Sequence, residues 1–274
     1  MSILEETSVI TNLKKRIAEI ASKNTIGHLP SSYSCLDILY VLYSKIMNIN
    51  PANKNSIKRD KVIISKEHCK MAQLAILEHL GLIDKSVVDE WQLNGGIVGH
   101  DMFKEVDTTG GKLAALDCAY GSLGQGIGLG TGLAMANPEN NVYVIVGDGE
   151  LQEGSCWEAL MYIGHNNIKN IITIIDRNNI QGGDYTKNII DTSSNCVEQI
   201  SSFGFEVFEV DGHNHEAMEE VFKLETDKPK AVVANTIKGK EFDYVRQGKG
   251  FLYFHSTPWE KEDFKIGMEV LENE

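Results

Sequence analysis

Short apolar runs that alternate with helical stretches constrain the fold of this chain more than any other feature. Five runs rich in Val and Ile read as strands covered on both faces: residues 62–65, 142–146, 171–175, 205–210 and 231–236. Apolar residues recur at helical spacing in residues 4–22, 35–47, 71–80, 125–136, 157–165, 196–203 and 215–225. Strands that alternate with helices predict an α/β fold with three layers, α/β/α, around a mostly parallel sheet. Because no repeat or long linker divides the chain, we expect one domain over residues 1–274.

The charge balance excludes some classes of partner. The chain has 26 Lys and Arg against 39 Asp and Glu, a formal net charge of −13, so a basic nucleic-acid footprint is not expected. Charged residues interrupt the apolar pattern of the N-terminus, which predicts neither a signal peptide nor a membrane anchor. The five cysteines are widely spaced and form no CxxC pair. We therefore expect a protein of the reducing cytoplasm with no disulfide framework, zinc site, nucleic acid or membrane partner.

Two long stretches carry no periodic pattern. Residues 94–120 and 238–260 are rich in Gly, Lys, Asp and aromatic residues, which predicts irregular structure. Loops of this length in a compact α/β domain are more often functional than idle. We expect both stretches to lie near the functional site.

Polar residues follow two of the expected strands. Gly147, Asp148 and Gly149 come directly after the run 142–146, and Asn178 follows the run 171–175. If these strands are neighbours in a parallel sheet, Asp148 and Asn178 meet at its carboxyl edge, where ligands of such sheets bind. Carboxylate and amide oxygens suit Mg²⁺, which completes its shell with water and substrate phosphates. Gly-Asp-Gly alone is a common turn, but the second polar turn favours a magnesium-bridged diphosphate.

The same residues resemble the signature of the thiamine diphosphate enzymes, in which GDG is followed after a short spacer, here residues 150–177, by Asn-Asn. Within that group the sequence GDGELQEG…WEALMYIGHNNIKNI…IDRNNIQ resembles the transketolase family. The resemblance continues in the segments GHLPSSYSCLDILYVLY (27–43), ISKEH (64–68), GH (99–100), GSLGQGIGLGTGLAMA (121–136), VDGHN (210–214) and DKPKAVVANTIKGK (227–240). The glycine-rich segment 121–136 fits neither a dinucleotide-binding nor a Walker loop. Its later glycines, spaced by four residues, read as a face for close helix packing.

The resemblance implies thiamine diphosphate and Mg²⁺, or Ca²⁺ or Mn²⁺, as cofactors. It implies three metal ligands, Asp148, Asn178 and Ile180. The cofactor contacts it implies are His68, Gly121, Ser122, Leu123, Gly147, Asp148, Gly149, Glu150, Asn178, Ile180 and His255.

Four histidines match family positions: His28, His68, His100 and His255. The resemblance implies that they line the substrate channel and move protons to and from sugar hydroxyls, a task that suits neutral imidazoles. A lone histidine is more often structural, and the remaining four fit no site motif; Asn214, between His213 and His215, reads as a helix cap. Glu153 either complements a helix dipole or, by resemblance, acts at the subunit interface near the catalytic carboxylate of the other subunit.

The resemblance covers the first domain of a transketolase, and the chain ends at Glu274. We therefore expect the amino-terminal subunit of a split enzyme, whose partner in an α2β2 assembly is a carboxy-terminal transketolase subunit. The implied reaction transfers a two-carbon ketol unit from a ketose or ketose phosphate to an aldose.

Departures from the family pattern leave the substrate open, with the metabolic pentose-phosphate reaction as the default. They lie at Leu29 to Ser32, Glu67 and Tyr120, and in the longer interval 101–120, all near the expected substrate channel. One alternative is a transketolase-like subunit for a specialised sugar in a biosynthetic pathway. A second is a non-catalytic partner that binds cofactor for assembly, and a third, a 2-oxo-acid decarboxylating subunit, has a different residue context around the same signature.

Overall fold

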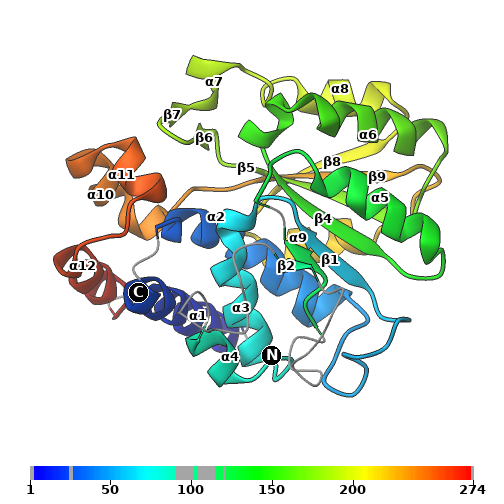
Figure 1. The fold of residues 1–274 in the computed structure, drawn as a ribbon. Coiled ribbons are helices and arrows are strands. Elements are labelled where there is room, and N and C mark those ends of the chain that lie inside the picture. Colours follow the sequence, from blue (N-terminus) through cyan, green and yellow to red (C-terminus); the bar gives the residue numbers. More distant parts are fainter. Residues whose placement is uncertain (1–2, 25–26, 91–101, 104–114, 120, 273–274) are drawn as a thin grey trace.

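A computed structural model describes residues 3–24, 27–90, 102–103, 115–119 and 121–272, and its centre is a seven-stranded sheet of order β2-β3-β1-β4-β5-β9-β8 (Figure 1). The strands are β1 (Lys61–Ile64), β2 (Met102–Phe103), β3 (Cys118–Ala119), β4 (Val142–Gly147), β5 (Ile171–Arg177), β8 (Glu206–Asp211) and β9 (Lys230–Asn235). All neighbouring pairs are parallel except β2 with β3. The predicted α/β fold with a mostly parallel sheet is confirmed.

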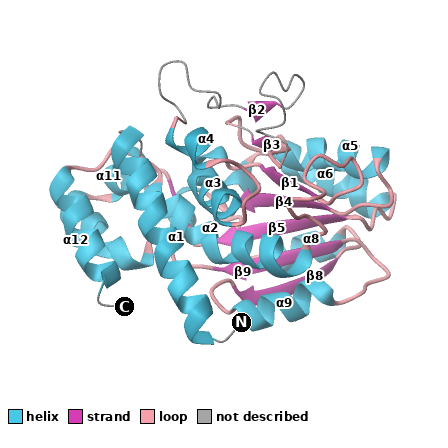
Figure 2. Ribbon diagram, turned by 90° about the horizontal axis from the view of Figure 1, so that it is seen from below, coloured by secondary structure: helices cyan, strands magenta, loops and turns pink. Residues whose placement is uncertain are grey.

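Helices cover both faces of the sheet (Figure 2). One face packs against α1 (Ile3–Asn24), α2 (Leu29–Val41), α3 (Lys70–His79), α4 (Lys85–Asp89) and α9 (His215–Lys223). The other packs against α5 (Gly126–Ala136), α6 (Gly154–His165) and α8 (Cys196–Ser202). Successive side chains of β4 alternate between the two cores, Tyr143 and Ile145 in one and Val144 and Val146 in the other. A strand buried on both faces has to be apolar throughout, which is why these runs stand out in the sequence.

The predicted strands and helices all occur, with shifts at their ends. The helix expected over 35–47 begins earlier, at Leu29, and closes in a π-helical turn, η1 (Leu42–Ile46). Short 3-10 turns occur at η2 (Glu67–Cys69) and η3 (Gly149–Gln152), and a small hairpin, β6 (Ile180–Gln181) with β7 (Asp184–Tyr185), leads into α7 (Thr186–Ile189).

The expectation of irregular structure over 238–260 is wrong. This stretch holds η4 (Lys240–Phe242), α10 (Asp243–Lys249) and α11 (Phe251–Ser256), and α12 (Lys261–Glu272) follows. Aromatic packing stabilises these short helices: the ring centroids of Phe242 and Trp259 are 5.0 Å apart, and Phe254 is fully buried beside them. Most of the other stretch, 94–120, lies outside the described residues.

The sheet brings the two polar turns together. Gly147 of β4 lies opposite Asp176 of β5, and Arg177 lies opposite Asn235 of β9. The turns after β4 and β5 therefore leave the carboxyl edge of the sheet side by side. The backbone N–H of Asp148 donates to the carbonyl of Asp176 at 3.3 Å and ties one turn to the other.

Candidate functional site

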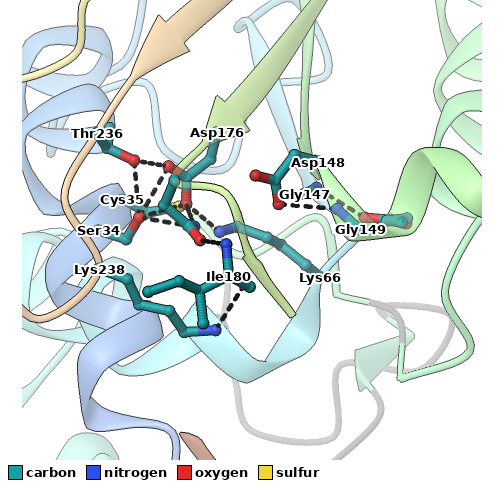
Figure 3. Close-up of polar contacts among 12 residues, drawn as sticks. Ser34, Cys35, Lys66, Gly147, Asp148, Gly149, Asp176, Ile180, Thr236 and Lys238 are labelled. Carbon is teal, nitrogen blue, oxygen red and sulfur yellow. Dashed lines mark hydrogen bonds and ion pairs between the residues drawn. The ribbon is translucent and has the colours of Figure 1, made fainter. Parts of the chain in front are cut away.

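Asp148 lies at the centre of the carboxyl edge, and its side chain is buried, with the residue 2% exposed. Its Oδ1 accepts a hydrogen bond from the backbone N–H of Gly149 at 2.8 Å, and its Oδ2 accepts one from Asn179. Burial, and then the negative charge of Asp176, raise the pKa of Asp148 to about 6 (Figure 3). A cation beside this carboxylate would offset both effects.

The other two predicted metal ligands lie in the turn after β5. The Oδ1 atom of Asn178 accepts a hydrogen bond from the backbone N–H of Ile180 at 3.0 Å. The Nδ2 atom of Asn178 donates to Ser34 Oγ at 3.1 Å and to Asp176 Oδ2 at 3.3 Å. The backbone N–H of Asn179 donates to Asp148, which ties the turn that carries Asn178 and Ile180 to the turn that carries Asp148. Their assignment as metal ligands stays a prediction.

Beneath these ligands lies a buried ion pair to which the sequence alone assigned no role. Asp176 and Lys66 are 0% and 1% exposed, and the Lys66 ammonium donates to Asp176 Oδ2 (Figure 3). Burial alone would raise the pKa of Asp176, but the charge and hydrogen bond of Lys66 outweigh it and lower that pKa to about 2. Burial lowers the pKa of Lys66, and the charge of Asp176 outweighs burial and raises it. Both groups are charged at neutral pH.

Three of the four predicted histidines form one cluster. The ring centroids of His28 and His255 are 5.0 Å apart, and each lies 5.6 Å from that of His68. His28 precedes α2 with a φ of 67°, and its backbone N–H donates to the carbonyl of His255 at 3.0 Å. Burial, followed by nearby Lys66 and Lys238, lowers the pKa of His68; burial and Lys238 lower the pKa of His255 to about 2. Both imidazoles are therefore neutral at pH 7. His100 lies outside the described residues.

Lys238 links the histidine cluster to the turn after β5. Its Nζ donates to the Nδ1 atom of His255 at 2.8 Å and to the carbonyl of Ile180 at 3.2 Å. Burial, and then the positive charge of Lys66, lower the pKa of Lys238 to about 8. In the sequence, Lys238 stands within TIKGK and Lys66 within ISKEH, and neither motif by itself indicates a role for its lysine. The available signal is a lysine two or three residues after the end of a strand, at the carboxyl edge of the sheet.

The remaining predicted site residues border this centre. Gly121, Ser122 and Leu123 are exposed at the turn before α5, and Gly147 and Gly149 flank Asp148. The carboxylate of Glu150 points inward, where it accepts hydrogen bonds from Ser65 Oγ and from the backbone N–H groups of Gly124 and Gly147. Glu153 is exposed, and its side chain packs against Gly124, whose φ of +85° favours glycine.

Two hydroxyls near the histidine cluster lack partners. Ser31 and Ser32 are 1% and 0% exposed, and their Oγ atoms make no hydrogen bond within the part of the chain that the structure describes. Their backbone N–H groups donate to the carbonyl of His28, so both lie in the first turn of α2 beside the cluster. Buried hydroxyls without partners are uncommon, and a bound polar molecule would satisfy them.

Comparison with known proteins identifies the family. Residues 6–266 match the transketolase thiamine diphosphate binding domain. The chain belongs to the transketolase family. Among transketolases, it is 32% identical over 240 residues to one subunit of the apulose-4-phosphate transketolase of Phocaeicola vulgatus, covering 85% of this chain and 82% of the relative. It is 32% identical over 276 residues to the 6-deoxy-6-sulfo-D-fructose transketolase subunit SqwG of a Clostridium species, covering 96% and 94%.

A solved transketolase shares the fold. The crystal structure of the Campylobacter jejuni enzyme superposes with a TM-score of 0.83 and 25% sequence identity, covering 99% of this chain and 43% of that one. The chain thus spans under half the length of that transketolase. By contrast, it covers most of the length of the two relatives that are named for transketolase subunits.

The donor set fits a diphosphate cofactor held through a cation. No group of three or more His, Cys, Asp or Glu side chains among the described residues could hold a metal ion by itself. One carboxylate, one amide oxygen and one carbonyl are hard oxygen donors that leave room for phosphate and water, the shell that Mg²⁺ favours. Two ammonium groups, on Lys66 and Lys238, lie beside them in an otherwise acidic chain. Within the described part of the chain, no helix is long and apolar enough to cross a membrane.

Proposed function

We propose that this chain is the thiamine diphosphate-binding subunit of a transketolase that moves a two-carbon ketol unit from a ketose or ketose phosphate to an aldose. The observation that carries the proposal is the cluster of His28, His68 and His255, in which the imidazoles of His68 and His255 are neutral. This cluster lies one side chain, Lys238, away from the turn that holds Asn178 and Ile180. A cation–diphosphate site and a set of proton carriers are thus adjacent. We further propose that residues 1–274 form one domain, since both cores pack on one sheet.

Asp148, Asn178 and the carbonyl of Ile180 would hold Mg²⁺, with Ca²⁺ or Mn²⁺ as substitutes. All three supply oxygen, which suits these cations. A Cβ on Gly149 would lie 2.7 Å from Cβ of Gln181, so packing within the chain itself requires glycine beside Asp148. The ammonium of Lys238 already contacts the Ile180 carbonyl, so it would lie beside the bound diphosphate and stabilise its charge.

Thiamine diphosphate, when bound, supplies the carbon nucleophile that the protein's own side chains lack. The histidines handle protons. Because Lys238 donates to Nδ1 of His255, the neutral imidazole carries its proton on Nε2, on the side away from Lys238. His255 would hold or release that proton at a substrate hydroxyl, and His28 and His68 would orient and exchange protons with neighbouring hydroxyls. His100 is proposed as a fourth member of the set.

A partner chain would complete the enzyme. We propose an α2β2 assembly with a carboxy-terminal transketolase subunit in the cytoplasm, where five buried cysteines that form no disulfide among the described residues suit a reducing environment. The exposed side of α5 and α6 supports burial against another chain: it carries Gly128, Gly132, Met135 and Met161, with Met135 53% and Met161 47% exposed. Glu153 is exposed beside this surface, as its proposed role at a subunit interface requires.

The substrate could be a general pentose phosphate or a specialised sugar. The two relatives described above are named for apulose 4-phosphate and 6-deoxy-6-sulfo-D-fructose, which supports a specialised sugar over a general pentose phosphate. One family departure does not bear on this choice. Glu67, where the family has Gly, is 5% exposed and accepts a hydrogen bond from the buried Lys70 at 3.1 Å. Its carboxylate is therefore buried and paired within the chain, although it is the neighbour of His68 in sequence.

The decisive experiment is purification of the tagged chain from its own host with thiamine diphosphate and Mg²⁺, followed by native mass measurement and a ketol-transfer assay. We expect a second protein in equal amount and turnover of a ketose–aldose pair. A complex that decarboxylates a 2-oxo acid instead would refute the transketolase assignment. A species that holds only this chain and no cofactor would favour the non-catalytic alternative.

A further inference from the structure

Asp176, two residues before the proposed metal ligand Asn178, accepts hydrogen bonds from five side chains, four of which are labelled in Figure 3. Ser34 Oγ donates to both carboxylate oxygens at 2.8 and 2.7 Å, and Cys35 Sγ lies 3.2 Å from Oδ2. Thr236 and Lys66 complete the set with Asn178. One fully buried carboxylate thus joins α2, the turn after β1, the end of β5 and the segment after β9.

The contact with Asn178 sets the direction of that amide. Its Nδ2 is held by two acceptors, Asp176 Oδ2 and Ser34 Oγ, so its oxygen faces the opposite way, toward the turn that holds Ile180. The Ile180 N–H uses one lone pair of that oxygen, and a second lone pair stays available. If the amide turned over, an NH₂ group would face the proposed cation and repel it.

The contact between Asp176 and Lys66 determines where the positive charge of the Lys66 ammonium lies. A Cβ on Gly147 would lie 3.4 Å from Cδ of Lys66, so the lysine side chain runs directly past the turn that carries Asp148. The ammonium pairs with Asp176 instead of with Asp148. Without Asp176, a buried ammonium would have Asp148 as the nearby acidic partner and would compete there with a cation.

We propose that Asp176 is a positioning residue of the metal site: it holds the Asn178 oxygen toward the cation and keeps the Lys66 ammonium from Asp148. This inference rests on the proposed function, because it assumes that Asp148, Asn178 and Ile180 bind a metal. It goes further in assigning the geometry of those ligands to a residue outside the proposed ligand set.

A purely structural role for Asp176 is the competing explanation, because removing one partner of a buried ion pair destabilises a fold strongly. Two double variants separate the two roles. Asp176→Asn with Lys66→Met removes both charges and leaves an amide oxygen that accepts from Asn178 Nδ2. Asp176→Leu with Lys66→Met removes the same charges and also the acceptor. Since Lys66 is changed in both, the pair differs only at position 176, which holds an amide that can accept from Asn178 or an apolar side chain of similar size that cannot.

The measurement is Mn²⁺ binding by electron paramagnetic resonance, with saturating thiamine diphosphate, on the chain purified from its host with the proteins that accompany it. Thermal unfolding is recorded for each sample. We expect the Leu variant to bind Mn²⁺ at least about 10-fold more weakly than the Asn variant, the range for residues that orient metal ligands. Equal affinities in two folded variants would overturn the positioning role.

If the Leu variant does not fold, two single variants test whether Asp176 and its partners orient Asn178. Ser34→Ala removes an acceptor from Asn178 as well as a donor to Asp176, whereas Thr236→Val removes a donor to Asp176 and leaves Asn178 untouched. We expect weaker Mn²⁺ binding in Ser34→Ala alone, and equal losses would overturn the proposal. If the unaltered protein binds neither Mn²⁺ nor thiamine diphosphate, the proposed function fails as well; if it binds both, a failure of the variants to differ concerns Asp176 only.

Discussion

Asp148 holds a negative charge in surroundings that disfavour it, since burial and Asp176 raise its pKa to about 6. Asp148→Asn keeps the shape and removes the charge. We expect Mg²⁺-dependent binding of thiamine diphosphate to weaken by about 100-fold or more, because a proposed metal ligand loses its charge. We expect the Tm to stay the same or rise, because the folded state no longer holds a buried, disfavoured carboxylate.

Isothermal titration calorimetry and thermal unfolding measure the two effects. Asp227→Asn is the matched control. That carboxylate is fully exposed and lies in the loop before β9, at the amino end of the strand and so away from the carboxyl edge of the sheet. An Asp148→Asn protein that binds cofactor and Mg²⁺ like the unaltered chain would show that the metal site lies elsewhere.

Lys238 is the second residue whose charge belongs to the site. Lys238→Met removes the ammonium that contacts both the Ile180 carbonyl and His255 Nδ1. We expect thiamine diphosphate to bind about 10- to 100-fold more weakly, the loss of one charge-assisted hydrogen bond. The pKa of His255 should also rise from about 2, because Lys238 is the second cause of its depression after burial.

Lys240→Met is the control for this change, because Lys240 is exposed two residues farther on. Calorimetry gives the cofactor affinity, and the pH dependence of the imidazole proton shifts gives the His255 pKa. Equal affinity in both variants would show that Lys238 takes no part in diphosphate binding. An unchanged His255 pKa would show that Lys238 does not contribute to its depression.

At the scale of elements, His215 connects α9 to α1 and α2 at a cleft of about 890 Å³. Its Nδ1 lies 2.9 Å from Glu6 and its Nε2 lies 2.7 Å from Asp37. Burial lowers the pKa of His215, but the hydrogen bond and charge of Asp37, followed by those of Glu6, outweigh it and raise that pKa. With a carboxylate at each nitrogen, the protonated ring donates to both and joins the three helices as a cation.

The sign of the pH dependence follows from the raised pKa. The stability that protonated His215 contributes is complete below about 6.5, its value in an unfolded chain. It is lost as pH rises through the higher pKa of the folded state. His215→Gln should therefore cost about 1 kcal/mol at pH 6 and less at pH 9. Urea unfolding at both pH values measures this, with His165→Gln, an exposed histidine, as control; a difference that does not shrink at pH 9 would contradict it.

Elements were predictable from sequence where burial imposes a pattern. The runs 142–146 and 171–175 had to be apolar because both faces of β4 and β5 are covered. The two strands, and the placement of the turns after them side by side, could therefore be predicted. Helices α10 and α11 escaped prediction because they are only 7 and 6 residues long and depend on aromatic packing distant in sequence. Asp176, Lys66 and Lys238 escaped because their roles arise from pairing across strands, which no local motif records.

At the scale of the whole molecule, the exposed side of α5 should be the place where another chain packs. A Cβ at Gly128 or Gly132 would meet no atom within 4 Å, so this chain by itself does not require glycine there. Glycine in a helix costs about 1 kcal/mol relative to better helix formers, which a close approach by another helix would offset. Gly132→Arg should therefore leave the Tm of the separated chain unchanged or higher.

The same Gly132→Arg change should break the assembly, because a long charged side chain would occupy the space of the packed neighbour. Gly248→Arg is the matched control: Gly248 lies in α10, is exposed, and also has no atom within 4 Å of an added Cβ. Native mass of each protein purified from the host measures assembly. We expect the partner to be retained with Gly248→Arg and lost with Gly132→Arg, together with ketol transfer. An intact complex with Gly132→Arg would place the interface on another surface. An arginine at position 132 would be a buried, unpaired charge in a close contact with the partner, and the partner would have to move away.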